Sequence, residues 1–228
     1  MLKIYGVPIS VHTRKVILFA IEKRIRYEIE PVIPFNPPAG WGELSPTGKI
    51  PVATHDGLTL RDSSVICTYL ERTHPQPALY PQSTGDLVQA LWFEEYADGT
   101  VFREVVQGLF VQKVIRPNIL KQPTDPAAIV AIENEALPKV FSFLEASIDG
   151  EFLAGGTLSV ADLAVASNLV NFHYLGYAVH RERYPKLAAY FNRLLHNAAL
   201  QTALRNEQPF ARSMGLDCEF LSSLNLAA

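Results

Sequence analysis

Residues 45–63 of this 228-residue chain read SPTGKIPVATHDGLTLRDS, and this stretch decides how the first part of the chain folds. Pro51–Thr54 and Leu58–Leu60 are short strand-forming runs, and the dipeptide Asp56-Gly57 between them is typical of a hairpin turn. Asp62 or Ser63 then caps a helix with one apolar face. The stretch therefore predicts two antiparallel strands followed by a helix.

Upstream, residues 2–30 have the pattern strand, helix, strand. Leu2–Tyr5 is a short apolar strand, Val11–Lys23 has apolar residues at helical spacing, and Tyr27–Glu30 alternates as a second strand. The polar face of this helix is formed by Arg14, Lys15, Glu22 and Lys23. A βαβ unit, the Pro-rich segment 31–41 and a ββα unit, in this order, predict a thioredoxin-like domain over residues 1–79.

Downstream, the alternation of strand and helix signals stops. Residues 73–85 form a connector rich in Pro, Gln, Ser and Thr, and the remainder predicts helix after helix. The expected helices cover approximately residues 86–120, 126–148, 159–174 and 185–204. Ser159 fits an N-cap with Asp162 three residues later, which is a helix-start signal. The predicted fold class is α/β plus all-α, with an all-helical domain over residues 86–228.

Composition excludes several classes of protein. Hydrophobic residues make up 48% and charged residues 19%, which excludes a disordered chain, and the net charge of −3 does not favour binding to nucleic acid or to an acidic membrane surface. The longest uncharged stretch, Leu163–His180, contains too many polar residues for a membrane span. The N-terminus lacks a signal-type apolar block, so we expect a cytoplasmic protein. Cys67 and Cys218 form no CxxC pair, and no metal site is expected.

The turn from the first strand into the first helix is the first candidate site. The unpaired N–H groups and the dipole of a helix N-terminus favour an anion there, and a thiolate is such an anion. Redox proteins of this fold hold a CxxC pair at this place, whereas this chain has the run Ser10–Thr13. The protein could therefore only stabilise a thiolate that a ligand brings. His12 is expected to be an exposed residue at the helix start.

Two further segments could hold the rest of such a ligand. If the Ile50–Pro51 bond is cis, the Ile50 backbone can pair with an extended peptide; the alternative is an ordinary loop proline before a strand. Ser63 can hold a carboxylate at a helix start and Asp62 can pair with an ammonium group, which together suit an α-amino acid head. The alternative is a helix cap without any ligand.

These segments together resemble one family, the cytosolic glutathione transferases. Tyr5–Val16 is similar to the first motif of the phi and delta types, in which a serine contacts the glutathione sulfur. Ser45–Pro51 resembles the family's loop before its cis-proline, and Leu60–Ile66 resembles its acidic-Ser motif for the γ-glutamyl group. Leu153–Asp162 is similar to its helix-capping motif in a bacterial-type second domain. The resemblance covers nearly the whole chain.

The resemblance implies a homodimeric enzyme that uses glutathione as co-substrate, without a metal, to conjugate small hydrophobic electrophiles. Ser10 takes the role of the sulfur donor by position, and Tyr5 is the alternative because related classes use a tyrosine near the end of the first strand. The residues implied in glutathione binding are Lys49, Ile50, Pro51, Asp62 and Ser63.

The electrophile pocket and one end of the glutathione site are less well defined. The pocket is expected to draw on Val7, Ile9, Tyr96, Phe102, Arg103 and Phe110, which could equally be core or subunit contacts. Members of the family commonly hold the glycine carboxylate with a cation before the cis-proline loop, but Pro34–Trp41 contains none. Lys49, or Trp41 and Asn36, could serve instead. A glutathione-dependent isomerase or dehalogenase and a non-catalytic binding protein remain alternative functions.

Overall fold

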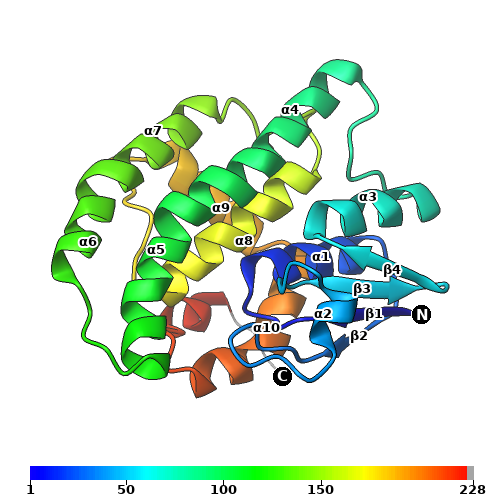
Figure 1. Cartoon of the computed structure of the whole chain (residues 1–228). Helices are drawn as coiled ribbons and strands as arrows, with labels where there is room; N and C mark the ends of the chain where they lie inside the picture. The colour runs from blue at the N-terminus through cyan, green and yellow to red at the C-terminus, as the bar shows by residue number, and fades with distance from the viewer. Residues whose placement is uncertain (225–228) are drawn as a thin grey trace.

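The computed structural model describes residues 1–224 and confirms the thioredoxin-like order of the first part of the chain. Figure 1 shows this part beside a larger helical part. Its elements are β1 (Leu2–Tyr5), α1 (Val11–Glu22), β2 (Tyr27–Glu30), α2 (Trp41–Leu44), β3 (Val52–His55), β4 (Leu58–Arg61) and α3 (Ser63–Thr73). The sequence pattern did not indicate the short helix α2, which lies at the end of the Pro-rich segment.

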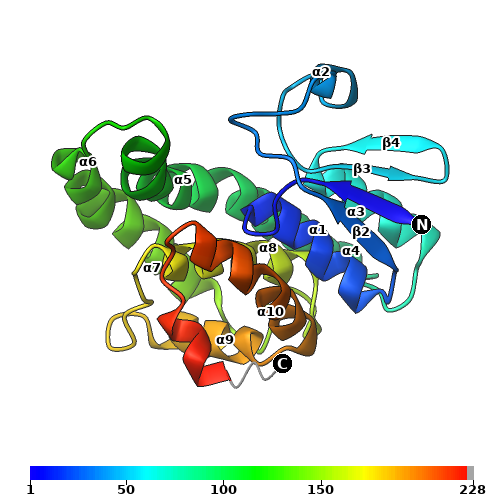
Figure 2. The same ribbon diagram turned by 90° about the horizontal axis from the view of Figure 1, so that it is seen from below.

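The four strands form one mixed sheet in the order β2-β1-β3-β4. β1 and β2 are parallel, as a βαβ unit requires, and β3 runs antiparallel to both β1 and β4. Figure 2 shows α1 and α3 on one face of the sheet and α2 on the other. Side chains alternate along β1, so Leu2 and Ile4 are fully buried and Lys3 and Tyr5 point to the opposite face.

The rest of the described chain is helical, as predicted. Residues 84–119 are continuously helical and are wound partly as π-helix, and residues 126–147 behave in the same way. The elements are α4 (Thr84–Glu95), η1 (Tyr96–Val106), α5 (Gln107–Phe110), η2 (Val111–Ile119), α6 (Pro126–Ala131), η3 (Ile132–Ala136), α7 (Leu137–Ser147), α8 (Val160–Tyr174), α9 (Pro185–Leu195), α10 (Ala198–Ser213) and the 3₁₀ helix η4 (Glu219–Leu224).

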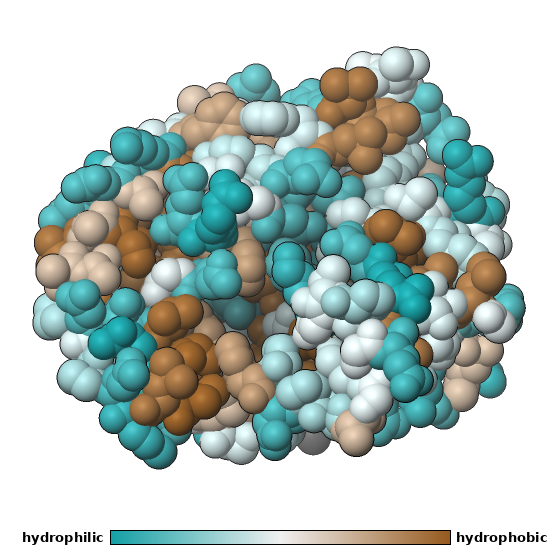
Figure 3. All heavy atoms as spheres, viewed as in Figure 1, coloured by the Kyte–Doolittle hydropathy of each residue, from teal (hydrophilic) through white to brown (hydrophobic). Residues whose placement is uncertain are grey.

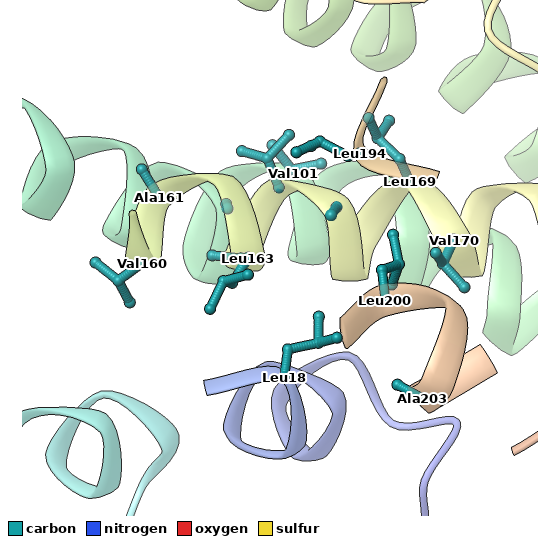
Figure 4. Close-up of a cluster of buried hydrophobic side chains, with 14 of the residues drawn as sticks. Leu18, Val101, Val160, Ala161, Leu163, Leu169, Val170, Leu194, Leu200 and Ala203 are labelled. Carbon is teal, nitrogen blue, oxygen red and sulfur yellow. The ribbon is translucent and has the colours of Figure 1, made fainter. Parts of the chain in front are cut away.

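Helix α8 lies at the centre of the molecule, and nearly all its residues are buried. Its predicted start is confirmed: Ser159 is the N-cap, and the Asp162 carboxylate accepts hydrogen bonds from the Ser159 N–H (2.8 Å) and hydroxyl (2.9 Å). One large apolar cluster joins the sheet domain to the helices around α8. Figure 4 shows Leu18 of α1 pointing toward side chains of α8 and α10.

The polar face expected for α1 is largely buried. Arg14 and Lys15 are fully buried and Lys23 is 5% exposed, because this face packs against the second part of the chain and the α3 region rather than against water. Each cation has an acidic partner: Arg14 pairs with Glu207, Lys15 with Glu94 and Asp98, and Lys23 with Glu71. Paired burial of this kind avoids most of the cost of an isolated buried charge.

The expected helix over residues 185–204 is wrong as a single helix. It ends at Leu195, and Asn197 caps a new helix, α10, by accepting a hydrogen bond from the Leu200 N–H (2.8 Å). An Asn side chain offers this cap more readily than it fits a helix interior, so the chain turns here. α10 then continues to Ser213, beyond the expected end.

Candidate active site

Ser10 is the N-cap of α1. Its backbone is extended, and its Oγ accepts a hydrogen bond from the Thr13 N–H (3.5 Å). No acidic residue lies in the first turn of α1 itself, so the positive end of the helix dipole meets no carboxylate of its own helix there. A serine hydroxyl can accept and donate at once, so Ser10 can still donate its proton to an anion bound at the N-terminus of the helix.

The turn that carries Ser10 packs tightly between α1 and the segment before β3. A Cβ atom on Gly6 would lie 2.6 Å from Thr13 Oγ1 and 3.5 Å from the Ile50 Cβ, so only glycine fits here without displacement. Ile50 lies just before β3, and the Ile50–Pro51 bond is cis. The first two candidate segments are therefore neighbours.

The third candidate segment meets the first through a buried lysine. Asp62, and not Ser63, caps α3 by accepting a hydrogen bond from the Ser64 N–H (2.9 Å), and its φ is +78°, an uncommon conformation for a residue with a side chain. Lys15 of α1 donates a hydrogen bond to Ser64 Oγ (3.0 Å). The N-termini of α1 and α3 and the cis-proline segment thus lie together, and residues expected in glutathione binding lie at or beside them.

Charged groups behind these helix ends form a connected cluster. Lys15 Nζ contacts Glu94 Oε1 (2.8 Å) and also Asp98 of η1. Burial alone would lower the pKa of Lys15, but Asp98 and Glu94 outweigh it and raise the pKa above its usual range. Burial alone would raise the pKa of Asp98, but the Lys15 charge and His12 hold it below its usual value. Lys15 and Asp98 therefore both remain charged near neutral pH.

His12 is not the exposed residue that its place in the sequence suggests. Its side chain is 23% exposed, its Nδ1 lies 3.4 Å from Asp98 Oδ1, and its ring lies 4.5 Å from the ring of Phe102. The helical part of the chain covers this end of α1, which sequence spacing could not indicate. In Figure 3 the surface is hollowed near the middle of the view, where this helical part meets the start of α1 in Figure 1.

Tyr5 lies on the α2 face of the sheet. Its ring is 6.3 Å from the ring of Trp41, and Lys3 Nζ lies 5.3 Å from the Tyr5 ring centroid. The Trp41 indole N–H donates to the Gly48 carbonyl (3.3 Å), so this donor is already used within the chain. Lys49 and Asn36 are exposed.

The residues that were expected around the electrophile do not all lie in one place. Phe102 lies against His12 at the start of α1, whereas Tyr96 packs on Phe143 of α7, with ring centroids 4.7 Å apart. Arg103 is exposed and Phe110 is half-buried against the main core. Val7 and Ile9 are buried, at 8% and 4% exposed. Among the four candidates from the helical part of the chain, Phe102 is therefore the one whose ring lies against a residue at the start of α1.

The acidic partners of α1 leave no local signal in the sequence, because Glu94, Asp98 and Glu207 lie far away along the chain. Within residues 1–224, no group of His, Cys, Asp and Glu side chains is arranged to hold a metal ion. In the same range, no helix is both long and apolar enough to cross a membrane.

Comparison with known proteins identifies both parts of the chain. Residues 4–78 match the model of the glutathione S-transferase N-terminal domain, and residues 108–198 match that of the C-terminal domain. The Escherichia coli K12 protein "Uncharacterized GST-like protein YibF" is 27% identical over 191 residues, with 82% of this chain and 91% of that protein covered. Arabidopsis thaliana glutathione S-transferase F13 is 29% identical over 170 residues, which cover 71% and 76% of the two chains.

A solved structure resembles the whole arrangement. The crystal structure of a glutathione S-transferase from Rhodospirillum rubrum F11 superposes with a TM-score of 0.82 at 26% identity and covers 90% of this chain and 92% of that one. The two domain models together match more than half of the chain, in the expected order. The chain belongs to the glutathione S-transferase family.

Proposed function

We propose that this protein is a glutathione transferase that conjugates the glutathione thiolate to small hydrophobic electrophiles. The observation that carries the proposal is the Ser10 hydroxyl at the N-terminus of α1, beside the cis-proline segment and the start of α3. Family membership supports the use of glutathione.

In this proposal the protein lowers the pKa of the glutathione thiol. A free thiol titrates near pH 8.5, and lowering its pKa by roughly two units corresponds to ~2.7 kcal/mol of preference for the thiolate. The Ser10 O–H donates to the sulfur, and the N–H groups of the first turn of α1 supply the electropositive field. The thiolate then attacks an electrophilic carbon, with the new S–C bond replacing the bond to the leaving group.

The rest of glutathione extends across the cis-proline segment toward α3. The Ile50 backbone next to Pro51 pairs with the peptide, Ser63 and the N-terminus of α3 hold the γ-glutamyl carboxylate, and Asp62 pairs with its ammonium group. One Asp62 oxygen is already used by the Ser64 N–H, which leaves the other for the ligand. Lys49, exposed before the cis-proline, is our candidate for the glycine carboxylate.

We assign glutathione binding to residues 1–79 and the electrophile pocket to residues 86–228, with Phe102 as its first candidate side chain. A cytoplasmic homodimer remains the predicted state. Support for a dimer comes from the exposed residues Val88, Leu91 and Trp92, which follow one another on one face of α4 and which we call the α4 stripe. Figure 3 shows apolar side chains gathered where Figure 1 has the N-terminal half of α4.

Retention on immobilised glutathione, followed by conjugation of a generic aryl halide, tests the function. Ser10→Ala and Tyr5→Phe are measured in parallel, and we expect Ser10→Ala to lower the rate while Tyr5→Phe retains it. A scaffold protein would show neither retention nor turnover, and an isomerase would bind glutathione but conjugate poorly. Full activity of Ser10→Ala together with loss in Tyr5→Phe would refute the serine assignment while leaving the function intact.

A further inference from the structure

Both the carbonyl and the N–H of the Ile9–Ser10 peptide bond form hydrogen bonds within the chain. The Ile9 carbonyl accepts hydrogen bonds from Asn171 Nδ2 of α8 (3.1 Å) and from Arg14 Nη2 (3.3 Å). The Ser10 N–H donates to the Val7 carbonyl (3.0 Å). We call this arrangement of Asn171 and Arg14 on the Ile9 carbonyl the Ile9 clamp.

The Ile9 clamp is itself fixed by a buried network. Arg14 is fully buried, and its Nε donates to both Glu207 oxygens (2.8 and 3.0 Å). Its Nη1 donates to Asn171 Oδ1 (2.7 Å) and to the Ser167 carbonyl (2.9 Å). A planar guanidinium with every nitrogen engaged has little freedom to rotate, so the position of the Ile9 carbonyl follows α8 and α10.

The Ile9–Ser10 peptide bond leads directly to the Ser10 Cα, which carries the side chain. Fixing this peptide bond therefore limits where the Ser10 hydroxyl can lie. Hydrogen bonding to a sulfur depends on distance and angle, and a displacement of ~1 Å at a reacting group can reduce a rate by about 100-fold. Asn171 belongs to the second part of the chain and has no direct role in the thiol-binding scheme proposed above. Its side chain is buried, and both ends of its amide are used in the Ile9 clamp.

We propose that Asn171 and Arg14 are positioning residues that aim the Ser10 hydroxyl at the ligand sulfur, so that the helical domain tunes the thiol chemistry of the sheet domain. This inference rests on the proposed function. It extends that function by placing the control of Ser10 on α8, at a residue outside the glutathione-binding segments.

The choice of variant follows from the burial of Glu207. Arg14→Ala would leave the Glu207 carboxylate buried without its cation, and that variant is expected to unfold. Asn171→Ala removes one donor to Ile9 and leaves the Arg14–Glu207 pair in place. Arg14→Lys is the second variant, because lysine keeps a charge for Glu207 but cannot also reach Ile9 and Asn171. Asn168→Ala is the matched control, since Asn168 is a buried Asn on α8 whose amide donates to Ala97 and Ala164 carbonyls instead.

The test is a double-mutant cycle between Asn171→Ala and Ser10→Ala, read out by the pH titration of the bound glutathione thiol and by kcat/KM for an aryl halide. In the Ser10 background, we expect Asn171→Ala to raise the thiol pKa by roughly 0.5–1 unit and to lower kcat/KM about tenfold. In the Ser10→Ala background, the same substitution should change neither the acid dissociation constant of the thiol nor kcat/KM by more than about twofold, because no hydroxyl remains to be aimed.

Arg14→Lys should shift the thiol pKa in the same direction, and Asn168→Ala should leave it unchanged. Equal effects of Asn171→Ala in both backgrounds, or an equal pKa shift from Asn168→Ala, would overturn the positioning role while the proposed function stands. If the wild-type protein neither binds nor conjugates glutathione, the proposed function fails and this inference fails with it.

Discussion

Gly6 is the residue at which the close packing of the Ser10 turn can be tested most directly. Gly6→Ala places a methyl group 2.6 Å from Thr13 Oγ1, in a buried site, so the turn or α1 must shift. We expect the free energy of unfolding to fall by about 1–3 kcal/mol, measured by urea denaturation. Gly85→Ala, where a Cβ meets no atom within 4 Å in the first turn of α4, should be neutral or slightly stabilising. Equal stability of Gly6→Ala and wild type would contradict this packing.

Asp62 combines a structural and a proposed binding role, and the substitution Asp62→Asn separates them. An asparagine at this position would still cap α3 and tolerates positive φ, so the free energy of unfolding should stay within about 0.5 kcal/mol of wild type. The lost negative charge should raise the KM for glutathione about tenfold with less effect on kcat. Steady-state kinetics at varied glutathione concentration measure this, and an unchanged KM would place the ammonium group elsewhere.

Contacts between residues close together in the chain could be predicted from the sequence, whereas contacts between distant residues could not. The Asp62-Ser63 and Ser159–Asp162 signals depend on contacts within three residues, so the sequence alone indicated a helix start at each. Arg14 was assigned to a polar face because its partner, Glu207, lies 193 residues away. The roles of Ser10 and Asp62 toward glutathione remain predictions, since they concern a ligand and no intrachain contact reports on them.

Helix α8 depends on one buried carboxylate at its start. Asp162 accepts hydrogen bonds from the Ser159 N–H and hydroxyl, the Leu153 N–H (3.0 Å) and the Tyr190 hydroxyl (2.7 Å). Asp162→Ala leaves these buried donors without an acceptor, and we expect a loss of about 4 kcal/mol in unfolding free energy. Asp149→Ala removes a carboxylate whose side chain is 92% exposed and should cost almost nothing. Urea denaturation compares the two variants, and similar losses would contradict the cap.

The other end of α8 should make stability depend on pH. The His173 ring lies 5.0 Å from the ring of Phe191 and 5.2 Å from that of Phe220, and burial lowers its pKa from 6.5 to about 4 although Asp217 opposes the shift. Below about pH 6.5 His173 takes up a proton in the unfolded chain but stays neutral in the folded chain. The stability that the neutral His173 contributes is therefore fully present above this pH and is lost as the pH falls toward 4. Between about pH 7 and pH 5 the protonation of His173 should therefore lower the free energy of unfolding by ~2 kcal/mol.

Urea denaturation of the wild type and of His173→Gln at a series of pH values measures this contribution. The difference between the two proteins should shrink as the pH falls, because glutamine does not titrate. A constant difference across the series would contradict a pKa of His173 that is lower in the folded chain than in the unfolded chain.

Sequence patterns indicated the order of the helices and strands better than they indicated where each one ends. Hydrophobic period and turn residues predicted every strand and the long helical stretches, because these signals are local. The break at Asn197 was missed because the apolar pattern continues across it, and only the Asn197 side chain, which accepts a hydrogen bond from the Leu200 N–H, marks a new helix. The π-helical winding of residues 96–106 left no recognised signal in the sequence.

The α4 stripe predicts which surface two copies of this chain bury when they form a dimer. Val88 and Trp92 are 61% and 55% exposed, which is costly for large apolar side chains unless a partner covers them. Trp92→Glu should shift the protein from dimer to monomer in sedimentation or light scattering. Val130→Glu changes another apolar, 50% exposed residue on α6 and should leave the dimer intact. A dimer that survives Trp92→Glu would exclude the α4 stripe as its interface.

The buried cations of α1 also constrain how such a protein can diversify. Arg14 and Lys15 have their acidic partners, Glu207, Glu94 and Asp98, in the other part of the chain. A chimeric protein could join this sheet domain to helices that lack those carboxylates. Both cations would then be buried without counter-ions, so we expect that such a chimera would not fold. An exchange of either part of the chain is therefore expected to succeed only when the matching cations and carboxylates are kept together.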